Sequence, residues 1–192
     1  LAAVSVAGVG MYLVFSLIIG LTTGVTVVMS QYYGAKEEDK VVKTFFSSIF
    51  IALGMTIFVT VIGLLMTRPL LIVLQTPAEV LDAAVLYLRI ICAGSVGTML
   101  YNWISAVLRS LGNSVVPLIF LGISSLLNIV FDILFVAVIP MGVGGAAFAT
   151  VLAQVISGVA CLLYAWKILP MLRIRRDKLK LDTFIGKQML VY

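Results

Sequence analysis

The stretch from Val116 to Ile168, VPLIFLGISSLLNIVFDILFVAVIPMGVGGAAFATVLAQVISGVACLLYAWKI, decides the fold. Two apolar runs, 116–139 and 145–168, stand on either side of the segment Pro140-Met141-Gly142-Val143-Gly144. Each run is 24 residues long, and a helix needs about 20 residues to cross the hydrocarbon core of a bilayer. Proline and glycine between the runs favour a tight turn. The stretch therefore predicts two antiparallel membrane helices that are joined by that turn.

The composition of the whole chain agrees with a helical membrane protein. Of its 192 residues, 62% are hydrophobic and only 11% are charged, and the mean hydropathy is +1.22. A soluble domain carries about 25% charged residues, so this chain lacks the polar surface of a soluble enzyme, and it resembles neither a disordered tail nor a secreted disulfide scaffold. The chain has no histidine, which excludes zinc helices and serine–histidine–aspartate triads. Cys92 and Cys161 lie within apolar runs, where we expect small buried side chains. We predict neither an enzyme nor a cofactor protein.

Five membrane spans are predicted along the chain, at about residues 1–33, 41–66, 77–111, 116–139 and 145–168. Residues Leu70 to Gln75 are apolar but too short to cross, so we expect an interfacial or re-entrant piece that follows a helix end at Arg68-Pro69. The sequence Thr76-Pro77-Ala78-Glu79 has the form of a capping box with proline at the first helical position. A basic tail is expected over residues 169–192. Because the chain begins at Leu1 inside an apolar stretch, we expect a fragment that lacks a first helix.

The distribution of basic residues predicts the orientation in the membrane. If the end after the fifth span is cytoplasmic, eleven basic residues lie on the cytoplasmic side and only two, Arg68 and Arg89, on the other. The eleven are Lys36, Lys40, Lys43, Arg109, Lys167, Arg173, Arg175, Arg176, Lys178, Lys180 and Lys187. Cytoplasmic loops of membrane proteins carry the excess of lysine and arginine. We therefore predict a multi-pass protein of the plasma (bacterial inner) membrane with a cytoplasmic tail. The net charge of +5 reflects this topology and does not indicate nucleic-acid binding.

Asp132 is the one acidic residue that lies well inside a predicted span. A charge at that depth is costly and usually faces a bundle interior, where it marks an ion or substrate pathway. Asn128 lies one turn earlier on the same face, and the next span brings Thr150 to the depth of Asp132 and Gln154 to the depth of Asn128. These four side chains are candidates for a Na⁺ or H⁺ site. A structural carboxyl at Asp132 and a Thr150 hydroxyl bonded to its own helix remain the alternatives.

Other polar or small residues in the spans carry weaker signals. Arg89 is expected to extend to the interface, and Asn102 could line a pathway or bond a neighbouring helix. The sequence Gly20-Leu21-Thr22-Thr23-Gly24 has the GxxxG spacing that allows close helix packing.

Three groups of residues resemble the N-terminal half of the multidrug and toxic compound extrusion (MATE) family. Their order and spacing together carry the resemblance, which covers about residues 1–180. The groups are Ser30-Gln31 with Gly34-Ala35; Arg109-Ser110-Leu111-Gly112-Asn113 with Pro117; and Gly142-Val143-Gly144-Gly145-Ala146-Ala147 with Ala149-Thr150.

The resemblance implies an all-α fold of five membrane helices, equivalent to helices two to six of a twelve-helix, two-lobe transporter. It implies an antiporter in the bilayer that exports small cationic or amphipathic compounds in exchange for Na⁺ or H⁺, with no cofactor. In the family, an asparagine and an aspartate on helix five and a threonine on helix six bind the cation, which matches Asn128, Asp132 and Thr150. A first helix with a further aspartate and the second lobe would complete the protein, so we expect this chain alone to be inactive.

Two other functions are compatible with these residues. A flippase for lipid-linked oligosaccharides of the same superfamily would line its cavity with basic residues, and Arg89 is the only candidate here. A membrane scaffold subunit without a transport cycle would require only a structural role for Asp132.

Overall fold

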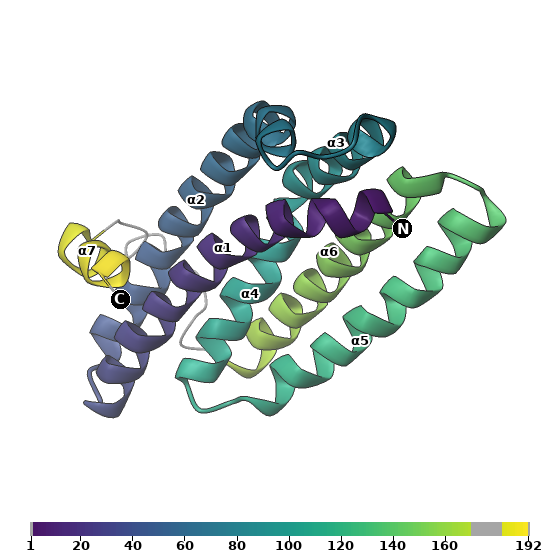
Figure 1. Cartoon of the computed structure of the whole chain (residues 1–192). Coiled ribbons are helices and arrows are strands. Elements are labelled where there is room, and N and C mark those ends of the chain that lie inside the picture. The colour runs from purple at the N-terminus through teal and green to yellow at the C-terminus, as the bar shows by residue number, and fades with distance from the viewer. Residues whose placement is uncertain (1, 170–181, 192) are drawn as a thin grey trace.

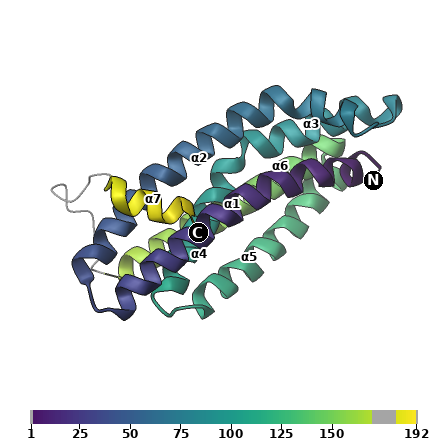
Figure 2. The same ribbon diagram turned by 60° about the vertical axis from the view of Figure 1, so that its left-hand side comes forward.

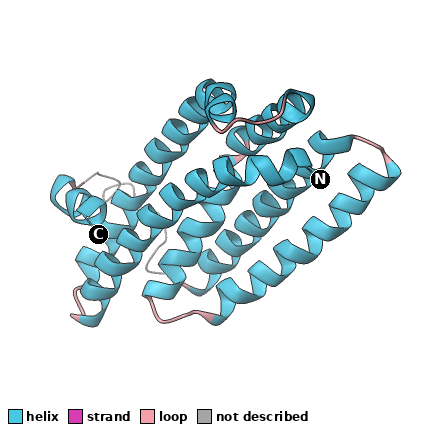
Figure 3. Ribbon diagram, viewed as in Figure 1, coloured by secondary structure: helices cyan, strands magenta, loops and turns pink. Residues whose placement is uncertain are grey.

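The computed structural model describes residues 2–169 and 182–191, and all the regular structure in this part of the chain is helical. The helices are α1 (Ala2–Gly34), α2 (Glu38–Val73), α3 (Ala78–Ala93), α4 (Ser95–Ser110), α5 (Val115–Asp132), the π-helix η1 (Ile133–Val138), α6 (Gly142–Ile168) and α7 (Thr183–Val191). Among the described residues, four helices are long and apolar enough to cross a membrane, and a fifth span results if the bent pair α3 and α4 crosses as one unit. The predicted all-α membrane fold is confirmed (Figure 3).

The long helices form one bundle in which α6 lies between α5 on one side and α3 and α4 on the other (Figure 1). Helix α1 packs against α2, α3 and α4, while α5 stands at an edge of the bundle. Only 6% of the most apolar window of the α5–η1 span is buried inside the protein. The large apolar side chains on this edge match a surface that faces hydrocarbon and not water.

Two clusters of buried side chains hold the bundle together. The larger cluster joins α1, α2 and α4 to parts of α6 and α7, with Phe46, Met29 and Leu108 among its fully buried members. At its centre, the indole Nε1 of Trp103 donates a hydrogen bond to Ser48 Oγ over 2.8 Å. The smaller cluster joins the end of α2 to α3 and the start of α6. The candidate polar residues of the sequence lie outside both clusters.

Helix α2 does not end at Arg68-Pro69, so the prediction of a separate piece over Leu70–Gln75 is wrong. The helix continues through Pro69 to Val73. Proline is tolerated inside membrane helices because local adjustments and neighbouring groups satisfy the freed backbone. Leu71 shows why the helix continues, since this side chain is completely buried in the smaller cluster.

The predicted capping box at the start of α3 is also not formed. The helix begins at Ala78, Pro77 occupies the N-cap position, and no side chain caps it. Thr76 instead closes the end of α2, because its N–H donates to Leu71 O over 3.1 Å while Gln75 takes a left-handed φ of 54°. This arrangement is typical of a helix C-terminus. The backbone of Thr76 is therefore engaged by the preceding helix.

The third predicted span is not one continuous helix, because it bends by 47° between α3 and α4. The bend lies at Gly94, where a Cβ atom would lie only 2.2 Å from a methyl carbon of Val151 on α6. The hydroxyl of Thr60 donates to the Cys92 carbonyl over 3.2 Å and lies 2.9 Å from Ser95 Oγ. A valine of α6 and a threonine of α2 thus occupy the two sides of the bend.

The fourth predicted span also changes its helical form. It runs as α5 to Asp132 and then as the π-helix η1 over six residues. Beyond the end of the π-helix, the N–H of Met141 donates to Phe135 O over 2.8 Å. Gly142 has a φ of 61°, a left-handed value that favours glycine. Gly145 allows close approach, since a Cβ there would lie 2.9 Å from Phe135 O. These glycines make the short turn that the sequence predicts.

Helix α7 was not predicted, since we expected a basic tail over residues 169–192. It lies across α1 and α2 (Figure 2), with Ile185 and Met189 buried in the larger cluster. The Asp182 carboxylate caps the helix by accepting from the N–H groups of Phe184 and Ile185. The Tyr32 hydroxyl donates to Gln188 Oε1 over 2.8 Å. The basic residues Arg173, Arg175, Arg176, Lys178 and Lys180 lie outside the described residues.

Candidate cation site between helices α5 and α6

Asn128 on α5 and Thr150 on α6 lie in direct contact. The amide Nδ2 of Asn128 donates to Thr150 Oγ1 over 3.3 Å, and that hydroxyl donates in turn to Ala146 O of its own helix over 3.1 Å. The two helices do bring these polar residues together across the short turn, but Thr150 pairs with Asn128 and not with Asp132, one turn away from the predicted register. The alternative for Thr150, a bond to its own helix, is present as well, so this hydroxyl serves both contacts.

Asp132 and Gln154 each have a buried side-chain oxygen atom, one turn from the Asn128–Thr150 contact on opposite sides of it. Asp132 Oδ1 and Gln154 Oε1 accept no hydrogen bond from any residue that the structure describes. A buried acceptor left unpaired costs about 1–3 kcal/mol, so such atoms usually have a partner of another kind. Carboxylate and amide oxygens are the ligands that hard cations prefer. The Asp132 oxygen therefore fits a cation or proton as its missing partner, and the Gln154 oxygen lies too far along the bundle to share it.

Tyr87 on α3 is a member of this cluster that the sequence analysis missed. Tyr87 is buried and lies close enough to Thr150 and Asp132 to interact electrostatically with both. A tyrosine hydroxyl in an apolar stretch usually has a polar partner when it is buried. This general rule was the only feature of the sequence that could have indicated Tyr87. The depth of Tyr87 could not be read from the sequence, however, because it depends on the bend at Gly94.

The local backbone explains how three helices meet at this point. Asp132 is the last residue of α5 before the π-helix, and π-helical turns are frequent at functional sites. The contact of Gly145 with Phe135 fixes the start of α6 against the π-helix, about one turn from Thr150. The contact of Gly94 with Val151 fixes α6 against the bend between α3 and α4. The cluster is thus held between two close glycine contacts.

The remaining candidates from the sequence do not join the cluster. The Asn102 amide donates to Thr98 O of its own helix over 2.8 Å, so a bond to a neighbouring helix is not its role. Arg89 is exposed, as expected for a side chain that extends to the interface. In the GxxxG sequence, Gly24 approaches Met189 O of α7, whereas Gly20 has open space around it. The pattern therefore marks the docking of α7 at one glycine only.

Comparison with known proteins identifies the family to which this bundle belongs. The MatE family profile matches residues 1–134 of the chain. The chain is 34% identical over 201 residues to the probable multidrug resistance protein YpnP of Bacillus subtilis, with 100% of this chain and 45% of that protein covered. The chain belongs to the MatE family. The predicted resemblance is therefore confirmed, and the chain is part of a family of multidrug efflux transporters in the membrane.

Other relatives and solved structures extend the comparison. The probable multidrug resistance protein NorM of Thermotoga maritima is 29% identical over 159 residues, with 78% of this chain and 34% of that protein covered. The chain superposes on the inward-facing conformation of a multidrug resistance MATE family transporter of the MOP superfamily with a TM-score of 0.90 at 24% identity. The match covers 100% of this chain and 44% of that transporter chain. A MOP superfamily transporter of Pyrococcus furiosus, whose binding pocket is described as reversed in polarity, gives the same TM-score and identity. The chain thus spans less than half the length of these MATE proteins.

Proposed function

We propose that this chain is part of a secondary active antiporter that exports cationic or amphipathic compounds in exchange for Na⁺ or H⁺. Asp132, Asn128 and Thr150, with the newly found Tyr87, form its cation site. The observation that carries the proposal is the buried, unpartnered oxygen of Asp132 one turn from the Asn128–Thr150 hydrogen bond. MATE multidrug relatives at 34% and 29% identity support the transport function.

The arrangement suits an ion-driven cycle for an electrostatic reason. An intramembrane carboxylate needs a proton or a cation to offset its charge. Transport is coupled to that ion only if two conformations of the protein bind it with different affinity. Asp132 lies at the junction of α5 and η1 and near two other helices, so a rearrangement of any of them changes its surroundings. Asp132 is the group that binds the ion, and the neutral neighbours orient it.

Substitution of Asp132 in the full-length transporter tests the proposal. We expect Asp132→Asn to keep expression and substrate binding and to abolish efflux driven by an imposed Na⁺ or H⁺ gradient in vesicles. Asn128→Ala and Thr150→Ala each remove a neutral group, and polar contacts between membrane helices average only about 0.6 kcal/mol, so both should weaken efflux less. Glu79→Gln is the matched control, because Glu79 is an exposed carboxylate in the first turn of α3.

The alternatives give different results in the same experiment. Coupled efflux at the wild-type rate by Asp132→Asn would refute the ion-binding role and leave Asp132 as a structural residue, as a scaffold subunit requires. A flippase for lipid-linked oligosaccharides would respond to Arg89→Gln instead. Arg89 is exposed and lies outside the polar cluster, so the observed geometry favours the antiporter.

A further inference from the structure

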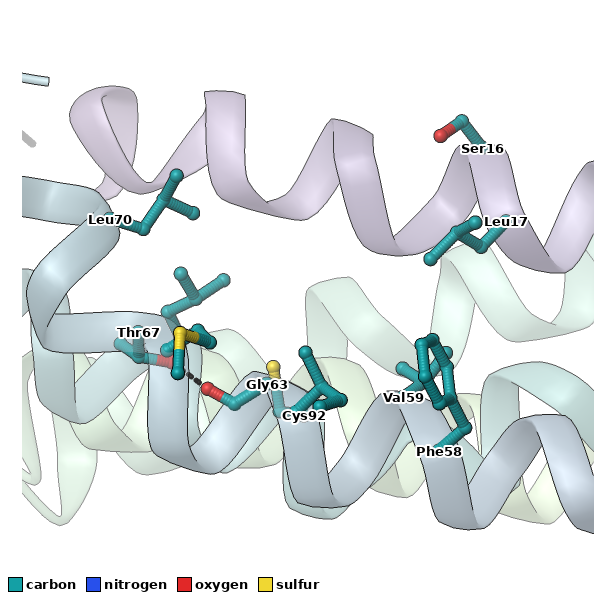
Figure 4. A pocket seen from close by; sticks show the side chains of 11 residues that line it. Ser16, Leu17, Phe58, Val59, Gly63, Thr67, Leu70 and Cys92 are labelled. Carbon is teal, nitrogen blue, oxygen red and sulfur yellow. Dashed lines mark hydrogen bonds between the residues drawn. The ribbon is translucent and has the colours of Figure 1, made fainter. Parts of the chain in front are cut away.

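An apolar cavity, away from the polar cluster, lies between α1, α2 and α3. Its volume is about 360 Å³, within the range of roughly 300–1,000 Å³ that is common for ligand pockets. Figure 4 shows Leu17 on one side and the α2 residues on the other, with Phe58 at one end and Leu70 at the other. The lining residues are Ser16, Leu17, Phe58, Val59, Ile62, Gly63, Met66, Thr67, Leu70, Leu88 and Cys92.

The lining of this cavity is suited to an apolar ligand. No charged side chain lines it. The Thr67 hydroxyl donates to Gly63 O within α2 (Figure 4), so it offers no free donor. A cationic compound would leave its charge without a partner here, which is costly in an apolar environment. A hydrocarbon chain has no such requirement.

The cavity has the length and direction of a lipid chain in one leaflet. Its α2 lining extends from Phe58 to Leu70, which are separated by about 18 Å at 1.5 Å per residue. Half of the hydrocarbon core is about 15 Å thick. Because α2 is a membrane-spanning helix, the cavity runs along the same direction as the acyl chains.

A basic residue stands at the end of the cavity where a lipid headgroup would lie. Arg68 lies between the lining residues Thr67 and Leu70, near the end of the cavity that is directed toward the turn between α2 and α3, and does not itself line the cavity. Its side chain is 55% exposed and meets the carboxylate of Asp82, itself 84% exposed, over 3.4 Å. A guanidinium group has five N–H donors, so this single long contact leaves several for a phosphate, the group that arginine binds well.

We infer that the cavity between α1, α2 and α3 binds one acyl chain of a phospholipid, whose phosphate is held by Arg68. The lipid comes from the leaflet at the α2–α3 turn. This site is independent of the proposed ion coupling, since none of its residues belongs to the polar cluster.

Photolabelling of the full-length protein in lipid nanodiscs tests the inference. The probe is phosphatidylglycerol with a diazirine in the middle of one acyl chain, and the adducts are mapped by peptide mass spectrometry. When tandem mass spectrometry assigns each adduct to a residue, we expect adducts concentrated on the lining residues Phe58, Ile62, Met66 and Cys92 and not on Leu65. Ile62→Trp should fill the cavity and lower this labelling about tenfold, which corresponds to ~1.4 kcal/mol. Leu65→Trp is the matched control, because Leu65 is exposed on the same helix and does not line the cavity.

Two further measurements test whether the phosphate headgroup contributes to binding and whether the occupant of the cavity is a lipid. Arg68→Gln should reduce labelling by phosphatidylglycerol but not by a diazirine-bearing diacylglycerol, which lacks phosphate. Leu17→Trp fills the cavity from α1 and replaces Ile62→Trp if that variant does not fold. Equal labelling of the Leu65 face and the cavity, or unchanged labelling in both tryptophan variants, would overturn the inference. Competition by the hydrophobic cation tetraphenylphosphonium, but not by unlabelled phosphatidylglycerol, would also overturn it and indicate a drug site.

Discussion

The contact between Gly94 and Val151 predicts a large effect from a single methyl group. In Gly94→Ala, the new Cβ would lie 2.2, 2.4 and 2.8 Å from Cγ2, Cγ1 and Cβ of Val151. Rotation of the valine cannot relieve this clash, because the Cβ of a side chain does not move when χ1 changes. The φ of Gly94 is −86°, which alanine adopts freely. The effect of the substitution is therefore steric, and α6 must move away from the bend.

The size of the effect follows from known costs of overpacking. Insertion of a methyl group into a well-packed region costs about 1–3 kcal/mol. At roughly 2–4 °C per kcal/mol for a domain of this size, the melting temperature should fall by about 2–12 °C. Val151 follows Thr150 directly, and the Asn128–Thr150 bond of 3.3 Å is already long. A displacement of α6 should therefore also reduce ion-driven efflux.

The assay is thermal unfolding in detergent, followed by far-UV circular dichroism, for Gly94→Ala, Val151→Ala and the double variant. Removal of the two valine methyls relieves the two shortest contacts but leaves the Cβ–Cβ contact of 2.8 Å, so the double variant should recover part of the loss, with an interaction energy of about 1 kcal/mol. Gly54→Ala is the control, since a Cβ there meets nothing within 4 Å. Wild-type stability of Gly94→Ala, or strictly additive losses in the double variant, would refute the steric explanation.

Three further predictions concern topology, completeness and the docking of α7. A single cysteine at Lys40, in a protein without Cys92 and Cys161, should react with a membrane-impermeant maleimide only from the cytoplasmic side, and labelling of intact cells from outside would reverse the topology. Residues 1–192 expressed alone should give no efflux above the vector control, because alternating access moves one repeat against another; clear drug resistance would contradict this. Gly24→Leu should displace α7, since even a Cβ at this position would lie 2.0 Å from Met189 O. Hydrogen exchange in residues 183–191 should become faster, and unchanged exchange would contradict the prediction.

The helices could be predicted because hydropathy alone determines which segments cross a membrane. The bend at Gly94 could not, because glycine inside a helical pattern is ambiguous and the residue that occupies the bend, Val151, lies 57 positions further along the chain. The π-helix after Asp132 has no signature in an apolar run. Helix α7 was missed because its burial depends on contacts with α1 and α2 and not on its own short sequence.

The polar cluster was partly predictable for a geometric reason. A short turn ties α5 to α6, so the sequence placed these polar residues of the two helices at similar depths, although it matched Thr150 with Asp132 and the structure pairs it with Asn128. Tyr87 belongs to a helix that is distant in sequence, and its depth is set by the bend. The role of Asp132, Asn128 and Thr150 in binding a cation stays a prediction.

The position of the cluster relative to the core bears on how an ion could move these helices. Both clusters of buried apolar side chains are densely contacted, and a packed core resists gradual deformation. The Asn128–Thr150 bond is long, the Asp132 and Gln154 oxygens lack partners among the described residues, and the backbone on either side is irregular at η1 and Gly94. Tyr87 connects this region to the smaller apolar cluster, and the close contacts at Gly94 and Gly145 also oppose a movement of α6. A cation or proton shifts these helix ends only if it binds one arrangement more tightly by enough to offset the loss of those contacts.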